Sequence, residues 1–164
     1  IVNLSDRRRR CGPLGQRRFN GFDGVVGRPS IHPIVDATAY VKDRQQFDSA
    51  ISEFQHTQFQ IADMLTELVA SRQMIRLAAS KLDNGDPNAS TYCAMAKRFA
   101  TDAGFNVCND ALQWFGGYGY IREYPMERYV RDTRVHQILE GTNEIMRVII
   151  SRQALMDGAL EVIQ

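Results

Sequence analysis

A long run of apolar residues at helical spacing restricts this chain to a helical fold. Between residues 61 and 82 apolar side chains recur every three or four positions, which places these residues on one face of a helix: Ile61, Met64, Leu65, Leu68, Ile75, Ala79 and Leu82. Arg72 interrupts this face, and a buried arginine would need a partner. No segment alternates apolar and polar residues as a strand does, so the sequence predicts an all-α protein.

Turn residues indicate where the predicted helices begin and end. Asn84-Gly85 should end the first long helix, because glycine readily adopts the left-handed conformation that follows a helix. Asp86-Pro87 suits the N-cap and first turn of a second long helix. Its apolar face carries Tyr92, Met95, Ala96, Phe99, Ala103 and Val107. A third long helix should follow Gly141, and brief connections between such helices predict an up-down helical bundle.

The two ends of the chain differ in charge and texture. Residues 1–34 are rich in Gly, Pro and Arg and show no period, so we expect a basic irregular or disordered arm, followed by a four-helix-bundle-like domain over residues 35–164. Seven arginines stand against two aspartates in residues 1–30, although the whole chain carries only +1. The arm lacks interleaved aromatic residues, so no nucleic-acid partner is expected.

Composition excludes several further classes of protein. The three cysteines, Cys11, Cys93 and Cys108, have no regular spacing, which favours a reducing compartment over a disulfide framework. No apolar run is long enough for a membrane span or a signal peptide. The histidines lack metal-ligand spacing, so no metal site is expected. The missing initiator Met is expected of an excerpt or a processed product.

Glu140 is the strongest candidate for acid–base chemistry, in the run QILEGTNEIMR. Ile138 and Leu139 precede it, and residues 141–143 should open a helix. An apolar pocket would disfavour the ionised carboxylate, whereas the helix N-terminus would favour it. A base balanced in this way could remove a weakly acidic proton from carbon near neutral pH. From these residues alone, the simpler interpretation is a glutamate that only interacts with the helix dipole.

Two other motifs suit a nucleotide-like ligand. The glycines of GGYGY, residues 116–120, could let backbone N–H groups approach a phosphate, although a helix C-cap and tight loop explain them more simply. Residues 44–47 offer a guanidinium, two amides and an aromatic ring, which suit a phosphate and a planar ring. The simpler interpretation of this second motif is a solvated helix end with one core phenylalanine.

Taken together, these stretches resemble the C-terminal helical domain of the acyl-CoA dehydrogenases. The matching runs, between Tyr40 and about Ala154, are DRQQF, FQIADM, AMAKRFATD, ALQWFGGYGYIREYPMERYVRD and ILEGTNEIMRVIISR. Within the family the chain looks most like the short branched-chain members, the isobutyryl-CoA dehydrogenases in particular. The resemblance implies an FAD-dependent oxidoreductase that converts an acyl-CoA to the 2-enoyl-CoA. Glu140 would remove the α-proton while the β-hydride passes to the flavin.

The resemblance also assigns contacts by position. Arg44 and Gln55 match residues that reach the FAD of a neighbouring subunit, and Phe47 matches the ring of the same motif. Other FAD contacts are implied for Gln113, Trp114, Phe115, Gly116, Gly117, Thr142, Asn143 and Glu144. Substrate contacts are implied for Asp23, Gly141 and Arg152, and the backbone N–H of Glu140 would polarise the thioester carbonyl.

The resemblance further implies partners and a location. Contacts between subunits imply a homotetramer, the electron acceptor would be an electron-transfer flavoprotein, and the compartment would be the mitochondrial matrix or the bacterial cytoplasm. The family's N-terminal helical and middle β-domains have no counterpart in this sequence, so the isolated fragment should be inactive. The alternative function is an inert helical bundle that retains only the oligomerisation surface.

Two departures from the family pattern concern the region around Arg44. Asp48 stands where the family motif has glycine, which should alter the loop after the first helix. Pro29 and Pro33 are expected to break any helix that reaches back from Arg44, because proline removes a backbone donor.

Overall fold

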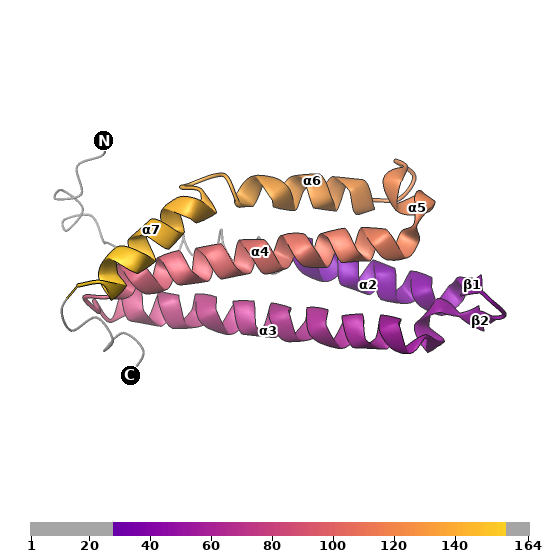
Figure 1. Cartoon of the computed structure of the whole chain (residues 1–164), viewed down its shortest axis with the longest axis horizontal. Helices are drawn as coiled ribbons and strands as arrows, with labels where there is room; N and C mark the ends of the chain where they lie inside the picture. The colour runs from indigo at the N-terminus through magenta and orange to yellow at the C-terminus, as the bar shows by residue number, and fades with distance from the viewer. Residues whose placement is uncertain (1–27, 157–164) are drawn as a thin grey trace.

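The segments with helical periodicity fold into a helical bundle in the computed structural model, which describes residues 28–156 (Figure 1). The α-helices are α2 (Arg28–Asp43), α3 (Gln55–Asp83), α4 (Ala89–Phe115), α5 (Gly117–Tyr120), α6 (Met126–His136) and α7 (Asn143–Ala154). Two short strands, β1 (Gln45–Gln46) and β2 (Ser49–Ala50), and a 3-10 turn, η2 (Ile51–Glu53), connect α2 to α3. Asp23, Cys11 and the arginines at positions 7–18 lie outside the described residues.

Helix α4 forms the centre of the bundle because much of its surface consists of small residues. Its buried small side chains include Ala94, Ala96, Ala100, Ala103 and Ala111. Short side chains let neighbouring helices approach closely. Helix α4 accordingly packs against α3 on one side and against α2, α6 and α7 elsewhere, as Figure 1 shows.

The apolar face predicted for residues 61–82 is only partly the buried face of α3. Met64, Leu68 and Ile75 are buried as predicted, whereas Leu65 is 49% exposed. Arg72 is half-buried, and the polar residue that enters the core is its neighbour Ser71, whose hydroxyl has no hydrogen-bond partner within residues 28–156. The helix therefore avoids burying a cation on this face.

The connection between α3 and α4 follows the predicted turn chemistry with one shift. Helix α3 ends at Asp83, and Gly85 has a φ of +68°. The N–H of Asp86 donates to the Lys81 carbonyl (3.0 Å) and that of Gly85 to the Leu82 carbonyl (3.1 Å), which is a Schellman motif. Asp86 is not the N-cap: its carboxylate accepts from Asn88 N–H, and α4 begins at Ala89.

Helix α2 corrects the predicted effect of the two prolines. It runs without interruption from Arg28 to Asp43, beginning before the position at which helical texture was expected. Pro29 falls in the first turn, where backbone N–H groups have no partner within a helix. Pro33 removes one hydrogen bond, but its ring is fully buried in the bundle, and this burial offsets the loss. The prediction that they break the helix is wrong.

The hairpin after α2 retains a tight turn in spite of Asp48. Gln45 pairs with Ala50 and Gln46 with Ser49, which leaves a two-residue turn. Phe47 and Asp48 both have positive φ angles, +55° and +61°. Hairpin turns of this kind require positive φ at both central positions, and aspartate tolerates that conformation better than most residues. Asp48 therefore takes the conformation that glycine would provide.

The remaining predictions from composition can be compared with the described region. Cys108 is buried and Cys93 is half-buried, in keeping with structural thiols in helices, and burial raises the pKa of both. None of the described helices is both long enough and apolar enough to cross a bilayer.

Candidate functional site

Glu140 lies in the loop between α6 and α7, residues 137–142, which we call the Glu140 loop. Its φ is +57°, a left-handed conformation that is costly for a residue with a side chain. Such conformations persist where the surroundings enforce them, and they cluster at functional sites. The carboxylate is exposed, and about half of the surface of Ile138 and of Leu139 is exposed as well. These residues therefore do not form the expected apolar pocket.

The predicted helix N-terminus does follow Glu140. Thr142 is the N-cap of α7, and its hydroxyl accepts a hydrogen bond from the Ile145 N–H at 3.4 Å. Gly141 has a φ of +94°, and a Cβ at this position would approach the terminal methyl carbon of Met146 to 2.7 Å. The positive φ therefore favours glycine next to Glu140, whereas the close contact falls on the far end of a flexible methionine side chain, which can shift.

Glu144 lies in the first turn of α7 and is an exposed carboxylate with a depressed pKa. The largest cause is a backbone hydrogen bond at the start of the helix, followed by a hydrogen bond from the Thr142 hydroxyl. The cations of Arg147 and Arg134 lower the pKa further. The first turn of α7 thus stabilises negative charge beside the Glu140 loop.

A buried polar cluster beneath the Glu140 loop escaped the sequence analysis. Its members are Lys97, Thr101 and Asp102 of α4, Gln137 of the loop and Asn143 of α7, which we call the Lys97 cluster. Lys97 is 5% and Asn143 is 3% exposed. The lysine in the run AMAKRFATD could have indicated this cluster. A helix face of small residues packs closely against its neighbours, so a lysine on that face is buried and needs partners.

Asn143, for which an FAD contact was predicted, directs its side chain into this cluster. Its Nδ2 donates to Asp102 Oδ1 at 2.6 Å and to Thr101 Oγ1 at 2.9 Å, and its Oδ1 accepts from Lys97 Nζ at 2.6 Å. Both ends of the amide are therefore used inside the bundle, and the backbone N–H of Asn143 is used there too, because it donates to the Gln137 carbonyl at 3.0 Å.

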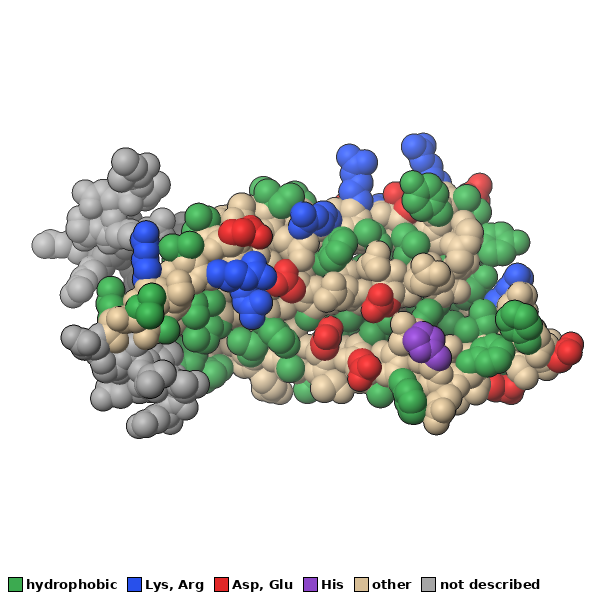
Figure 2. All heavy atoms as spheres, viewed as in Figure 1, with side chains coloured by type: hydrophobic (Ala, Val, Ile, Leu, Met, Phe, Trp, Pro, Cys, Tyr) green, Lys and Arg blue, Asp and Glu red, His purple; other side chains and the backbone are tan. Residues whose placement is uncertain are grey.

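A second group of predicted residues gathers at the opposite end of α4, which we call the hairpin end: Arg44, Phe47, Gln55, Gln113, Gly116 and Gly117. All six are exposed, and Phe47 is 89% exposed. The Arg44 guanidinium lies 5.9 Å from the centre of the Tyr118 ring, which connects the end of α2 to the GGYGY segment. Figure 2 shows apolar side chains collected at this end of the molecule.

Trp114 and Phe115 belong to the same predicted run but point inward. The Trp114 Nε1 donates to Gln60 Oε1 at 2.9 Å, and Phe115 stacks on Tyr40 with ring centres 4.1 Å apart. Both side chains are more than nine-tenths buried. They fix the end of α4 from inside, while Gln113 and the two glycines face outward.

The two groups of candidate residues are separated along α4. Lys97 and Trp114 mark the two positions, and a helical rise of 1.5 Å per residue puts them roughly 25 Å apart. Arg152, exposed in the last turn of α7, lies roughly 15 Å beyond Thr142 by the same measure. The predicted residues therefore do not form a single pocket within the described chain.

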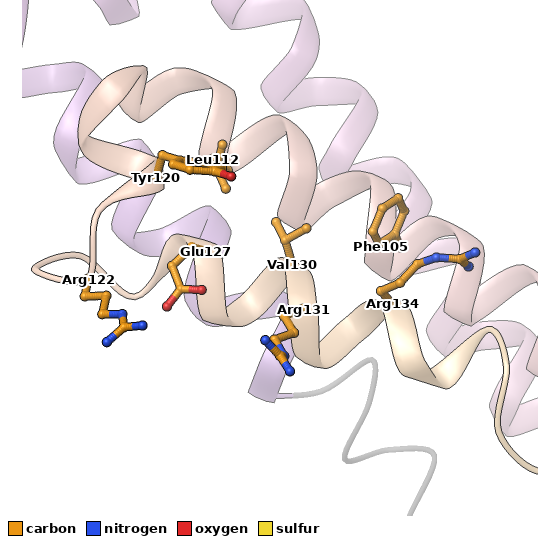
Figure 3. Close-up of a pocket in the computed structure, with 8 residues that line it drawn as sticks. All are labelled: Phe105, Leu112, Tyr120, Arg122, Glu127, Val130, Arg131 and Arg134. Carbon is orange, nitrogen blue, oxygen red and sulfur yellow. The ribbon is translucent and has the colours of Figure 1, made fainter.

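A groove of about 550 Å³ runs between α4 and α6, away from most predicted residues (Figure 3). Its lining residues are Phe105, Leu112, Tyr120, Arg122, Glu127, Val130, Arg131 and Arg134. Arg134 lies over the Phe105 ring and donates to the side chain of Gln137, so one edge of the groove touches the Glu140 loop. Among residues 28–156 no cluster of His, Cys, Asp or Glu has the arrangement of a metal site.

Comparisons with known proteins agree on one family. The model of the acyl-CoA dehydrogenase C-terminal domain matches residues 30–155. The chain is 56% identical to isobutyryl-CoA dehydrogenase of Dictyostelium discoideum and 54% identical to that of Bos taurus, both mitochondrial, over 76% of this chain. It spans 30% of the length of each of these relatives.

Solved structures give the same result. Butyryl-CoA dehydrogenase from Megasphaera elsdenii superposes with a TM-score of 0.79 at 36% identity, covering 87% of this chain and 37% of that chain. The helical bundle is thus found as one part of a larger enzyme.

Proposed function

The chain belongs to the acyl-CoA dehydrogenase family, of which it contains the C-terminal domain, and we propose that it supplies the catalytic base and part of the FAD site of an enzyme that oxidises a short branched-chain acyl-CoA to the 2-enoyl-CoA. The observation that carries the proposal is the conformation of Glu140. A non-glycine residue is held at positive φ, beside a helix N-terminus, with its carboxylate accessible.

Glu140 offers two chemical groups to a thioester. Its carboxylate can remove the proton from the α-carbon. Its backbone N–H donates no hydrogen bond to any residue between 28 and 156, so it is available for the thioester oxygen. Negative charge develops on that oxygen as the α-proton leaves, and a fixed donor there stabilises the transition state.

The residues of the hairpin end fit an extended dinucleotide such as FAD. A Cβ placed on Gly116 or Gly117 would meet nothing within 4 Å, so the backbone of this segment is open to a ligand. Arg44 provides a cation for a phosphate, and the exposed Phe47 ring provides a surface for a planar ring. When bound, FAD supplies an acceptor for the hydride that leaves the β-carbon.

The separation of the two groups supports an assembly in which one chain serves two flavins. Residues 140–144 would meet the FAD of their own subunit, whereas Arg44 and Gln55 would reach the FAD of a neighbour in a homotetramer. The remaining domains would supply the apolar cover that Glu140 lacks here. An electron-transfer flavoprotein is the proposed acceptor, and the mitochondrial matrix and the bacterial cytoplasm are the two proposed compartments.

The test uses a complete, FAD-loaded enzyme that contains this chain as its C-terminal domain. With isobutyryl-CoA and a ferricenium acceptor, Glu140→Gln should lower kcat by roughly 10³-fold, since a general base contributes on that scale. Flavin absorbance after gel filtration should stay unchanged. Glu67→Gln removes an exposed carboxylate on α3 and serves as the matched control. Retained turnover, or loss of flavin, would contradict the assignment of Glu140 as the base.

The second candidate function is an inert bundle that retains only the oligomerisation surface. Apolar side chains on α3 favour it, because they are exposed in the isolated chain: Phe59, Leu65, Val69 and Leu77. Sedimentation of the chain alone, with and without FAD, separates the two candidates. Self-association without flavin binding supports the inert bundle, whereas FAD-dependent assembly supports the catalytic domain.

A further inference from the structure

Lys97 is a buried cation for which the proposed reaction has no direct use. It lies on the small-residue face of α4 and is 5% exposed. Burial lowers the pKa of its ammonium group, while the carboxylates of Asp102, Glu144 and Glu140 act in the opposite direction. A desolvated lysine is costly to keep, so its hydrogen bonds indicate what it does.

All three N–H donors of the ammonium group have an acceptor at the Glu140 loop or the start of α7. Nζ lies 2.9 Å from the Gly141 carbonyl, 2.6 Å from Asn143 Oδ1 and 3.5 Å from the Gln137 carbonyl. The two carbonyls belong to residues on either side of Glu140. Lys97, on the side of the loop that faces α4, thereby bridges the beginning and the end of the Glu140 loop by hydrogen bonds.

A second layer of hydrogen bonds holds the same acceptors in place. Asp102 Oδ1 accepts from Gln137 Nε2 at 2.7 Å and from Asn143 Nδ2 at 2.6 Å. The Asn143 N–H donates to the Gln137 carbonyl at 3.0 Å, which closes the loop on itself. Arg98 and Arg147 each lie 3.6 Å from the other oxygen of Asp102. The loop is therefore fixed by side chains of α4, a rigid central helix.

From this arrangement we propose that Lys97 is a positioning residue for Glu140, acting through the Gly141 and Gln137 carbonyls to hold Glu140 in its left-handed conformation. The inference rests on the proposed function, because it gives Lys97 a role only if Glu140 is the base. Lys97 touches neither substrate nor flavin in this role. It sets the direction in which the Glu140 carboxylate and N–H leave the loop, and an error of about 1 Å in such groups costs roughly 100-fold in rate.

The experiment replaces Lys97 in the complete FAD-loaded enzyme. Lys97→Met keeps an unbranched side chain that is one atom shorter and removes every donor. We expect kcat with isobutyryl-CoA to fall roughly 100-fold, KM to change less than about threefold and FAD content to stay constant. The isotope effect on kcat with α-deuterated substrate should rise, because proton removal becomes slower than the other steps. Arg76→Met, which removes an exposed cation on α3, should leave these values near wild type.

Hydrogen exchange provides a measurement that does not depend on turnover. In Lys97→Met, peptides that cover residues 137–143 should exchange faster, while peptides from the middle of α3 should not change. If Lys97→Met fails to assemble, Lys97→Gln, which keeps an N–H donor on a shorter side chain, takes its place and should show a smaller loss of kcat with the same local exchange.

The outcomes separate the two proposals. A variant of Lys97 that assembles with wild-type kcat and wild-type exchange in residues 137–143, while Glu140→Gln is inactive, overturns the role of Lys97 alone. Wild-type turnover in Glu140→Gln overturns the proposed function itself. Loss of FAD together with faster exchange throughout the chain would show that Lys97 only stabilises the fold, and would also overturn the positioning role.

Discussion

The hairpin end and the Glu140 loop both contain residues at positive φ, yet they are held in different ways. Phe47 and Asp48 lie in an exposed turn between two short strands, β1 and β2. Glu140 is exposed too, but the backbone on either side is bonded to the buried Lys97 cluster. The proposed function explains the difference: a flavin would complete the hairpin end when it binds, whereas the Glu140 carboxylate would have to be oriented before the substrate arrives.

The difference is also one of chemistry. The hairpin end offers an aromatic ring, a guanidinium and open glycine backbone, none of which has many partners within the described chain. The Lys97 cluster uses nearly every donor and acceptor it contains on itself. Substitutions in the Lys97 cluster should therefore lower the stability of the chain strongly, whereas substitutions at the hairpin end should change it little.

The largest effect is expected at Asn143. Asn143→Ala removes one buried partner from the Lys97 ammonium group and one from the Asp102 carboxylate, and should lower the free energy of unfolding by about 3 kcal/mol. Thr142→Ala removes only the α7 cap and should cost about 1 kcal/mol. Urea denaturation of the chain measures both. A smaller loss for Asn143→Ala than for Thr142→Ala would contradict the buried cluster.

The pKa of the Cys108 thiol tests whether water is excluded from the middle of α4. Burial raises the pKa of its thiol to about 11, and a hydrogen bond with Thr133 opposes this only in part. The unfolded chain ionises near 9.0, so the stability contributed by the thiol is complete below that pH and is lost as pH rises towards 11. The loss should be about 2 kcal/mol between pH 8 and pH 11.

The comparison of wild type with Cys108→Ala isolates this titration from that of other groups. The stability difference between the two proteins should shrink over that pH range, measured by urea midpoints at constant ionic strength. A difference that does not vary with pH would mean that water reaches the thiol.

A smaller effect, of opposite sign, is expected at Glu140 itself. Glu140→Gly relieves the left-handed strain and should raise the free energy of unfolding by about 1 kcal/mol. Glu140→Gln keeps the strained backbone and loses the same charge, so it is the control, and calorimetry should find Glu140→Gly the more stable of the two. Equal melting temperatures would mean that the loop stores no strain.

The smallest effect is expected at Phe47. Its ring is almost fully exposed and makes an edge contact with Phe54, with ring centres 6.4 Å apart. Phe47→Ala should change the stability of the chain by less than about 0.5 kcal/mol. In the complete enzyme the same variant should retain less FAD through gel filtration. A large loss of stability in the chain alone would remove the contrast between the two regions.

Local chemistry predicted much of the fold. Gly85 ends α3, and the apolar spacing of α3 and α4 places both in a bundle. Pro33 misled because a rule about one missing hydrogen bond says nothing about how deeply the ring is buried. Asp86 misled because its carboxylate bonds to Asn88 before the helix begins.

The candidate site was predictable in its residues but not in its support. Glu140 and the GGYGY segment could be recognised from neighbours in sequence. The partners of Lys97 come from 40 to 46 residues away, so no local pattern reveals them. The run from Gln113 to Gly117 was carried over as one unit, whereas the structure directs Trp114 and Phe115 inward, because successive residues at a helix end point to different sides.

A single uninterrupted helix, α4, connects the Glu140 loop with the hairpin end. Helix α4 has 27 residues and a length of about 40 Å, with Lys97 beneath the Glu140 loop towards one end and the glycine-rich turn at the other. Inserting a single amino acid between Lys97 and Trp114 would rotate one end against the other by about 100° and shift it by 1.5 Å. Insertions and deletions should therefore be tolerated better in the connections at residues 84–88 and 121–125, which lie outside α4 and do not change the relative orientation of its two ends.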